Sequence, residues 1–158
     1  MMPNYTRMTK PIEYIVIHHS LTKDGKTVDW DAIRKYHMTD PGHRWVDIGY
    51  HYGIENVNGV YKIMIGRPEW AVGAHCKENS MNHKSLGICV VGNYDLGLPP
   101  EEAMEQLVIL CANLCHKYKI PVANIVPHSK YATYKTCPGK MFVMEELRRR
   151  VDERLKGK

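Results

Sequence analysis

The segments Tyr14-Ile15-Val16-Ile17 and Leu86-Gly87-Ile88-Cys89-Val90-Val91 decide the fold class of this chain. Each is a short and nearly continuous apolar run, which is typical of a central strand that is covered on both faces of its sheet. A sheet of such strands needs a packed layer on each side. We therefore expect an α/β domain with helices on both faces of the sheet.

The segments around these two runs predict the remaining elements. Apolar residues that recur every three or four positions predict amphipathic helices at about 29–38, 101–118 and 140–155. Strands are expected at 50–54 and 61–65, on either side of the hairpin signal Asn58-Gly59, and at 124–126. The order of elements predicts a single α/β domain with a central mixed β-sheet flanked by helices.

The composition is that of one globular domain. The chain has 158 residues, of which 44% are apolar and 25% are charged, so it can bury a core and is too apolar for disorder. No apolar run approaches the roughly 20 residues of a membrane span, and none follows the N-terminal basic residues as in a secretory signal peptide. We expect an N-terminal extension at 1–11, the domain at 12–155 and a tail at 156–158.

The charge is basic and uneven. The net charge is +5, and the segment 140–158 holds seven basic and four acidic residues. A basic balance favours anionic partners such as nucleic acid, a membrane surface or an acidic polymer, without choosing among them. The run Arg148-Arg149-Arg150 on the last predicted helix is either a solvated face or a weak attraction to an anionic surface.

Three polar clusters lie at the ends of predicted strands: two directly follow a strand, and one opens the strand expected at 50–54. They are His18-His19-Ser20, Gly49-Tyr50-His51, and Pro127-His128-Ser129 with the later Cys137. Zinc prefers imidazole nitrogen and thiolate sulfur, and a catalytic zinc keeps one position open for water. His18, His128 and Cys137 are therefore candidate ligands of one Zn²⁺. The residues alone leave an alternative open, in which the histidines are packed core residues and the cysteine is a small buried apolar side chain.

Six motifs in a particular order carry a family resemblance. They are Ile15-Val16-Ile17-His18-His19-Ser20, Asp47-Ile48-Gly49-Tyr50-His51-Tyr52, Gly66-Arg67-Pro68, Gly73-Ala74-His75, Asn82-His83-Lys84-Ser85-Leu86-Gly87-Ile88 and Lys135-Thr136-Cys137-Pro138-Gly139. The order resembles the type 2 N-acetylmuramoyl-L-alanine amidases, a superfamily that includes zinc-dependent phage lysozymes and animal peptidoglycan recognition proteins. The resemblance covers about 12–151 and implies a central sheet with flanking helices.

The resemblance also implies roles for individual residues. It places His18, His128 and Cys137 at the three zinc-ligand positions, and Tyr50 and Lys135 at the catalytic positions. It further implies a substrate-binding group made of His75, Asn82, Arg67 and His51. One feature departs from the family: Ser129 and Lys130 follow His128, where members often carry an acidic residue. A carboxylate that orients His128 would have to come from another segment.

The implied activity is zinc-dependent hydrolysis of the amide between N-acetylmuramic acid and L-alanine in peptidoglycan. We expect a monomeric phage or prophage endolysin with no separate cell-wall-binding domain and no nucleic-acid partner. It would be made in the host cytoplasm without a signal peptide and would act on the wall after release. Three alternatives stay open: a cytoplasmic amidase that recycles muropeptides, a non-catalytic peptidoglycan-binding module, and a regulator that binds a polymerase.

Overall fold

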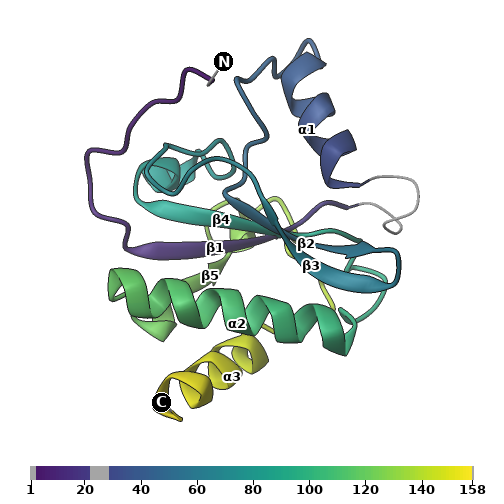
Figure 1. The fold of residues 1–158 in the computed structure, drawn as a ribbon, viewed down its shortest axis with the longest axis vertical. Coiled ribbons are helices and arrows are strands. Elements are labelled where there is room, and N and C mark those ends of the chain that lie inside the picture. Colours follow the sequence, from purple (N-terminus) through teal and green to yellow (C-terminus); the bar gives the residue numbers. More distant parts are fainter. Residues whose placement is uncertain (1–2, 22–28, 158) are drawn as a thin grey trace.

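A five-stranded mixed sheet forms the centre of the computed structural model, which describes residues 3–21 and 29–157 (Figure 1). The strands are β1 (Tyr14–His19), β2 (Tyr52–Val57), β3 (Val60–Ile65), β4 (Ser85–Val90) and β5 (Ile125–Pro127). Their order in the sheet is β3-β2-β4-β1-β5. Within these five strands, the β2–β3 hairpin is antiparallel, whereas the pairs β2–β4, β4–β1 and β1–β5 are parallel. This arrangement confirms the mixed sheet predicted from the sequence.

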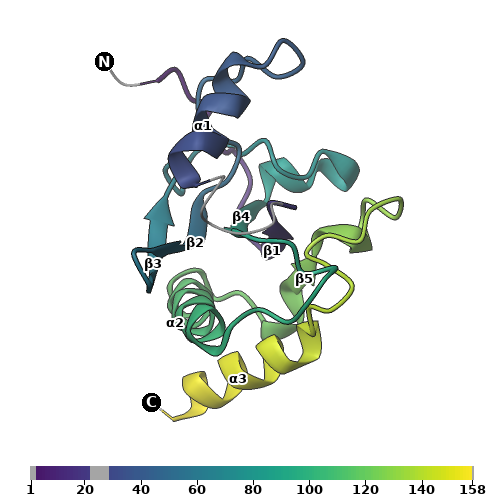
Figure 2. The same cartoon turned by 90° about the vertical axis from the view of Figure 1, so that its right-hand side faces the viewer.

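Helices cover both faces of the sheet. The helices α2 (Glu101–Tyr118) and α3 (Met144–Lys156) lie on one face, and α1 (Trp30–Thr39) lies on the other (Figures 1 and 2). The helix α1 begins after Asp29, whose side chain accepts a hydrogen bond from the backbone N–H of Ala32 at 2.8 Å. Trp30 anchors α1 to the sheet, because its ring fills the space above Gly53 of β2.

The alternation of side chains along β1 decides where the site can form. Ile15 and Ile17 point to the face covered by α2 and α3 and belong to the main apolar core. Val16 points to the opposite face and packs against Cys76 and Met81, which lie in and beside the 3₁₀ turn η1 (Glu78–His83). His18 follows the same alternation as Val16. It therefore emerges on the face that is covered by loops and by α1.

The structure corrects two predicted boundaries. The last helix begins at Met144 and not near Lys140, because the backbone N–H groups of Lys140 and Met141 are bonded to Asp95 and to the carbonyl of Tyr94 instead of forming a helical turn. The strand expected at 50–54 begins at Tyr52. Tyr50 and His51 thus lie just before the strand, and of the two only Tyr50 lines the cavity described below.

The three consecutive arginines of α3 are engaged within the chain. Arg149 pairs with Glu146 and Glu153, and Arg150 pairs with Glu101 at the start of α2. Arg148 donates to the carbonyl of Ile125 at 2.8 Å. These contacts leave little free cationic surface on this run and favour its interpretation as a solvated face.

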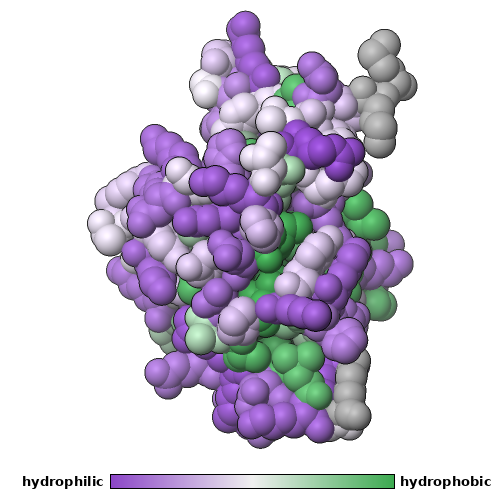
Figure 3. Space-filling view, turned by 90° about the vertical axis from the view of Figure 1, so that its left-hand side faces the viewer, coloured by the Kyte–Doolittle hydropathy of each residue, from purple (hydrophilic) through white to green (hydrophobic). Residues whose placement is uncertain are grey.

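The face shown in Figure 3 is largely polar. On the face in Figure 3, apolar residues gather in a strip that runs from the middle of the view towards its lower end. Among the described residues, no helix is both long enough and apolar enough to cross a membrane.

Candidate active site

Three candidate metal ligands converge where β1 and β5 end. Ile17 of β1 lies opposite Pro127 of β5, so His18 and His128 leave the same edge of the sheet as neighbours, with ring centroids 4.5 Å apart. Cys137 joins them because its carbonyl accepts the backbone N–H of Ser129 at 2.9 Å. One potential ligand atom from each of His18, His128 and Cys137 lies within 4.8 Å of the others, and all three residues are buried.

The donor set fits zinc. The Cys137 Sγ and His18 Nδ1 atoms are 3.7 Å apart, and tetrahedral zinc with ordinary bond lengths would hold sulfur and nitrogen about 3.6 Å apart. Burial raises the pKa of the Cys137 thiol to about 12, so a thiolate at this position needs a cation beside it. Burial and the neighbouring His75 keep the pKa of His18 well below its ordinary value, so the imidazole is neutral and has a lone pair to offer.

A carboxylate from a distant loop faces His128. Glu78 of η1 places its Oε1 3.8 Å from His128 Nε2, and the hydroxyl of Tyr134 donates to its Oε2 at 2.8 Å. The carboxylate that faces His128 is thus on another segment of the chain. Since Nε2 faces Glu78, we infer that Nδ1 of His128 is the atom available to a metal. Carboxylates in this position orient a ligating histidine and increase its basicity.

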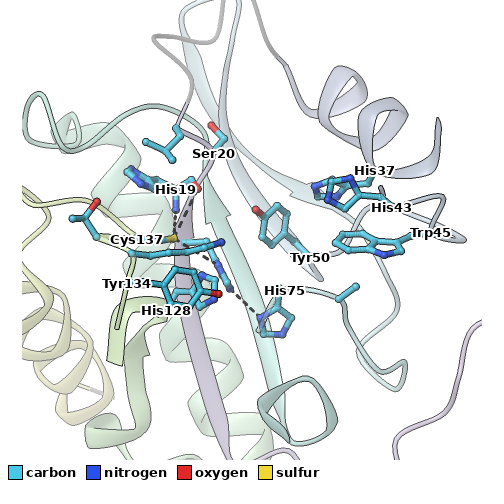
Figure 4. A pocket seen from close by; sticks show the side chains of 15 residues that line it. His19, Ser20, His37, His43, Trp45, Tyr50, His75, His128, Tyr134 and Cys137 are labelled. Atoms are coloured by element: carbon cyan, nitrogen blue, oxygen red, sulfur yellow. Dashed lines mark hydrogen bonds between the residues drawn. The ribbon is translucent and has the colours of Figure 1, made fainter. Parts of the chain in front are cut away.

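An open cavity of about 470 Å³ lies against the three candidate ligands (Figure 4). One wall carries the cysteine-bearing loop with Tyr134, Lys135 and Thr136. The opposite wall consists of aromatic and imidazole side chains, namely His37, His43, Trp45 and Tyr50. A polar chain that carries carbonyl and hydroxyl groups could lie between these walls and reach the ligands.

Tyr50 and Lys135 both line this cavity. The ring of Tyr50 lies 5.1 Å from that of His18 between centroids. Burial raises the pKa of the Tyr50 hydroxyl well above its ordinary value, with the neighbouring Cys89 and Cys137 acting in the same direction, so the hydroxyl stays protonated and can donate. Lys135 is exposed on the loop that leads to Cys137. The cavity therefore offers a neutral donor and a cationic donor near the candidate ligands.

The predicted substrate-binding residues divide into two kinds. His75 lines the cavity and contacts His18. Arg67, Asn82 and His51 are not among the described residues that line it. The Arg67 guanidinium donates to the carbonyls of Ile48 and Val72, both at 2.9 Å, and holds the segment that leads to Tyr50.

Asn82 and His51 brace the loop that carries His75. The Asn82 side-chain oxygen accepts the backbone N–H groups of His75 and Cys76, each at 2.8 Å. His51 is fully buried, accepts the N–H of Gly87 at 3.0 Å and donates to the carbonyl of Ala71 at 2.7 Å. These bonds suit a supporting role better than direct contact with a substrate.

The sequence model of the N-acetylmuramoyl-L-alanine amidase family matches residues 8–140. The chain belongs to this family. It is 31% identical over 137 residues to the endolysin of Enterobacteria phage K11, a match that covers 85% of this chain and 84% of the endolysin. It is 36% identical over 139 residues to peptidoglycan-recognition protein SC2 of Drosophila melanogaster, covering 85% and 72% of the two chains.

Solved structures of the family share the fold. The N-acetylmuramoyl-L-alanine amidase LysC from Clostridium intestinale superposes with a TM-score of 0.73 at 28% identity and 94% coverage of both chains. A point mutant of Drosophila PGRP-LB in complex with tracheal cytotoxin superposes with a TM-score of 0.73 at 27% identity, covering 92% of this chain and 86% of that one. The amidase fold therefore extends over nearly the whole of this chain.

Sequence reasoning missed the far wall of the cavity and the carboxylate behind His128. His37 lies within the helix predicted at 29–38, but the helical spacing does not show that it faces the ligands across a cavity. Glu78 directly precedes two non-glycine residues with positive φ, Asn79 and Ser80, in a turn that has no recognisable sequence pattern. A search for acidic residues near the cavity-lining segments could have singled out Glu78 only with the fold in hand.

Proposed function

We propose that this chain is a zinc-dependent amidase that hydrolyses the bond between N-acetylmuramic acid and L-alanine in peptidoglycan. The observation that carries the proposal is the buried group of His18, His128 and Cys137 at the base of a cavity that Tyr50 and Lys135 also line. Membership of the amidase family supports the reaction class, and the presence of an endolysin among the relatives supports a lytic role.

Zinc held by His18, His128 and Cys137 would polarise the amide carbonyl and lower the pKa of a bound water from about 15.7 to about 7. Side chains of the protein would supply the hydrogen bonds and the proton transfer. The Tyr50 hydroxyl and the Lys135 ammonium, which both line the cavity, would donate to the oxygen that gains negative charge. One of them also passes a proton to the departing nitrogen. The C–N bond breaks, the lactyl carbonyl carbon keeps the new oxygen as a carboxylate, and the proton leaves with the amino group of L-alanine.

The donor set favours an enzyme over a module that only binds the wall. Binding requires a cavity with stacking and hydrogen-bonding groups, which the wall of His37, His43 and Trp45 already supplies. It does not require a buried cysteine beside two buried histidines. These three side chains can hold a zinc ion, and hydrolysis of an unreactive amide needs the carbonyl polarisation and the activated water that zinc supplies.

We also propose that the substrate is the intact wall, which the protein reaches after release from the cell that makes it, and that the protein acts as a monomer. The alternative is an amidase that recycles soluble muropeptides. The cavity is open at its surface and could admit a polymer strand. A turbidity assay on intact cell walls, compared with cleavage of soluble fragments, decides between the two.

The deciding experiment measures bound metal and wall hydrolysis together. The purified protein should hold about one zinc per chain and release new amino termini, but no new reducing sugar ends, in a chelator-sensitive manner. Cys137→Ala should lose metal and activity together. Activity of Cys137→Ala at the normal rate without zinc would refute the proposal, as would wall binding by the native protein without cleavage.

A further inference from the structure

A buried chain of hydrogen bonds runs from a backbone carbonyl to the candidate ligand His18. The Ser85 hydroxyl lies 2.5 Å from the carbonyl oxygen of Met81 and 3.3 Å from His75 Nε2. His75 Nδ1 in turn lies 2.9 Å from His18 Nε2, and Figure 4 shows the dashed line that leaves His75. We call these four residues the hydrogen-bond chain.

The carbonyl at the end of the hydrogen-bond chain fixes the direction of every bond in it. A carbonyl oxygen can only accept, so the single hydroxyl proton of Ser85 points to Met81. The hydroxyl oxygen must then accept from His75, which places a proton on His75 Nε2. A neutral imidazole carries one proton, so His75 Nδ1 is an acceptor.

The acceptor atom of His75 also decides which ring nitrogen of His18 carries a proton. Because His75 Nδ1 accepts, His18 Nε2 must carry the proton that it receives. His18 Nδ1 is then left with its lone pair, and this is the atom that lies 3.7 Å from Cys137 Sγ. The hydrogen-bond chain therefore selects the one neutral tautomer of His18 that can bind a metal beside the cysteine.

The fold is built around the His75 ring. A Cβ atom at Gly87 would lie 2.5 Å from His75 Cγ, and a Cβ atom at Gly73 would lie 2.6 Å from His75 Cδ2. A side chain at either glycine would therefore collide with the His75 ring, so the two glycines leave the space that this ring occupies. Ser85 is fully buried and His75 nearly so.

We propose that Ser85 and His75 are positioning residues that fix the metal-binding tautomer and the ring orientation of His18. This assigns His75 to the support of a ligand instead of to direct contact with the substrate. The inference rests on the proposed function, because it gives His18 the role of a zinc ligand. Partners of this kind typically change metal affinity by about 10–100-fold when they are removed.

The first test reads the tautomers directly in the metal-free protein. Long-range ¹H–¹⁵N correlation spectra distinguish protonated from unprotonated ring nitrogens of each histidine. We expect the proton on Nε2 in both His18 and His75. A proton on Nδ1 of His75 in the native protein overturns the proposal, whatever the enzymatic activity turns out to be.

The second test measures the affinity for zinc by competition with a chelator. Ser85→Ala removes one hydroxyl and should weaken zinc binding by about 10–100-fold, with activity recovered at saturating zinc. Tyr94→Phe is the matched control, because it also removes a buried hydroxyl that donates to a backbone carbonyl, here that of Val91 at 2.7 Å. The control should lose a similar amount of stability and keep its zinc affinity.

The two proposals fail in different ways. Unchanged zinc affinity in Ser85→Ala, together with a raised KM at saturating zinc, would show that His75 contacts the substrate and would overturn the positioning role. No zinc binding by the native protein would overturn the proposed function. The tautomer spectrum is recorded without metal, so it tests the hydrogen-bond chain separately.

Discussion

Replacement of Gly87 by alanine tests the packing behind the site. Gly87 lies in the middle of β4, between β1 and β2, with Val16 as its partner across the ladder. An added Cβ would lie 2.5 Å from Cγ, 2.6 Å from Cδ2 and 2.7 Å from Nδ1 of His75. Ordinary contacts of this kind are 3.4–4 Å. Because strands on both sides hold the β4 backbone, the imidazole ring must retreat by about 1 Å.

The size of the effect follows from two losses. Crowding of a packed interior costs about 1–3 kcal/mol. A ring that retreats by about 1 Å also stretches its 2.9 Å bond to His18 beyond hydrogen-bond range, and buried groups left unsatisfied cost about 1–3 kcal/mol. We expect a total loss of roughly 2–6 kcal/mol in the free energy of unfolding, which is equivalent to a fall in Tm of roughly 4–24 °C for a chain of this size.

The assay is chemical and thermal unfolding together with zinc affinity. Gly97→Ala is the control, because Gly97 has no atom within 4 Å of the added Cβ and does not have a positive φ. That variant should be neutral or slightly more stable, since alanine restricts the unfolded chain more than glycine does. If Gly87→Ala were as stable as the native protein and bound zinc equally well, the close packing of His75 against β4 would be refuted.

Three further predictions follow from the site. Tyr50→Phe should keep its zinc and lose about 10²–10³-fold in kcat, because it removes one donor to the developing oxyanion; a kcat near that of the native protein would exclude this role. Glu78→Gln should weaken zinc binding by about 10-fold or more, measured by competition with a chelator, and Glu78→Asp should recover part of the loss; equal affinities in all three proteins would contradict the orientation of His128 by this carboxylate. Burial lowers the pKa of His51 from 6.5 to about 4. As the pH drops, the unfolded chain therefore binds a proton on this imidazole before the folded chain does. The free energy of unfolding of the metal-free protein should then fall between pH of about 6.5 and about 4. Urea unfolding at a series of pH values checks this, and a flat profile over that range would argue against a neutral buried His51.

The elements of the fold followed closely from local patterns. The continuous apolar runs at Ile15 and Leu86 became the two buried central strands β1 and β4, and the spacing of apolar residues located α2 correctly. The signal Asn58-Gly59 became a hairpin turn with positive φ at both residues, as its chemistry requires. The start of α3 was placed too early, because hydrogen bonds to the distant residues Tyr94 and Asp95 hold the backbone outside the helix.

The candidate ligands could be selected from residue type and motif order, but their surroundings could not. Glu78 is 50 positions from His128 in the sequence, and only the pairing of loops over the sheet brings its carboxylate within 3.8 Å. Arg67 and His51 were expected to touch substrate on the strength of the motifs that contain them. In the structure their polar atoms are bonded to backbone groups behind the cavity.

The sequence by itself determined the α/β class, the main helices and strands, and the residue types that can hold zinc, because these depend on hydrophobic periodicity and on the chemistry of single side chains. Only the tertiary structure decided which atoms of those side chains face one another. The tautomer of His18, the carboxylate behind His128 and the wall of His37, His43 and Trp45 all depend on strand register and on contacts between loops that are far apart in the chain. Hydrogen bonds act over about 3 Å, so they are set by the final packing of the backbone.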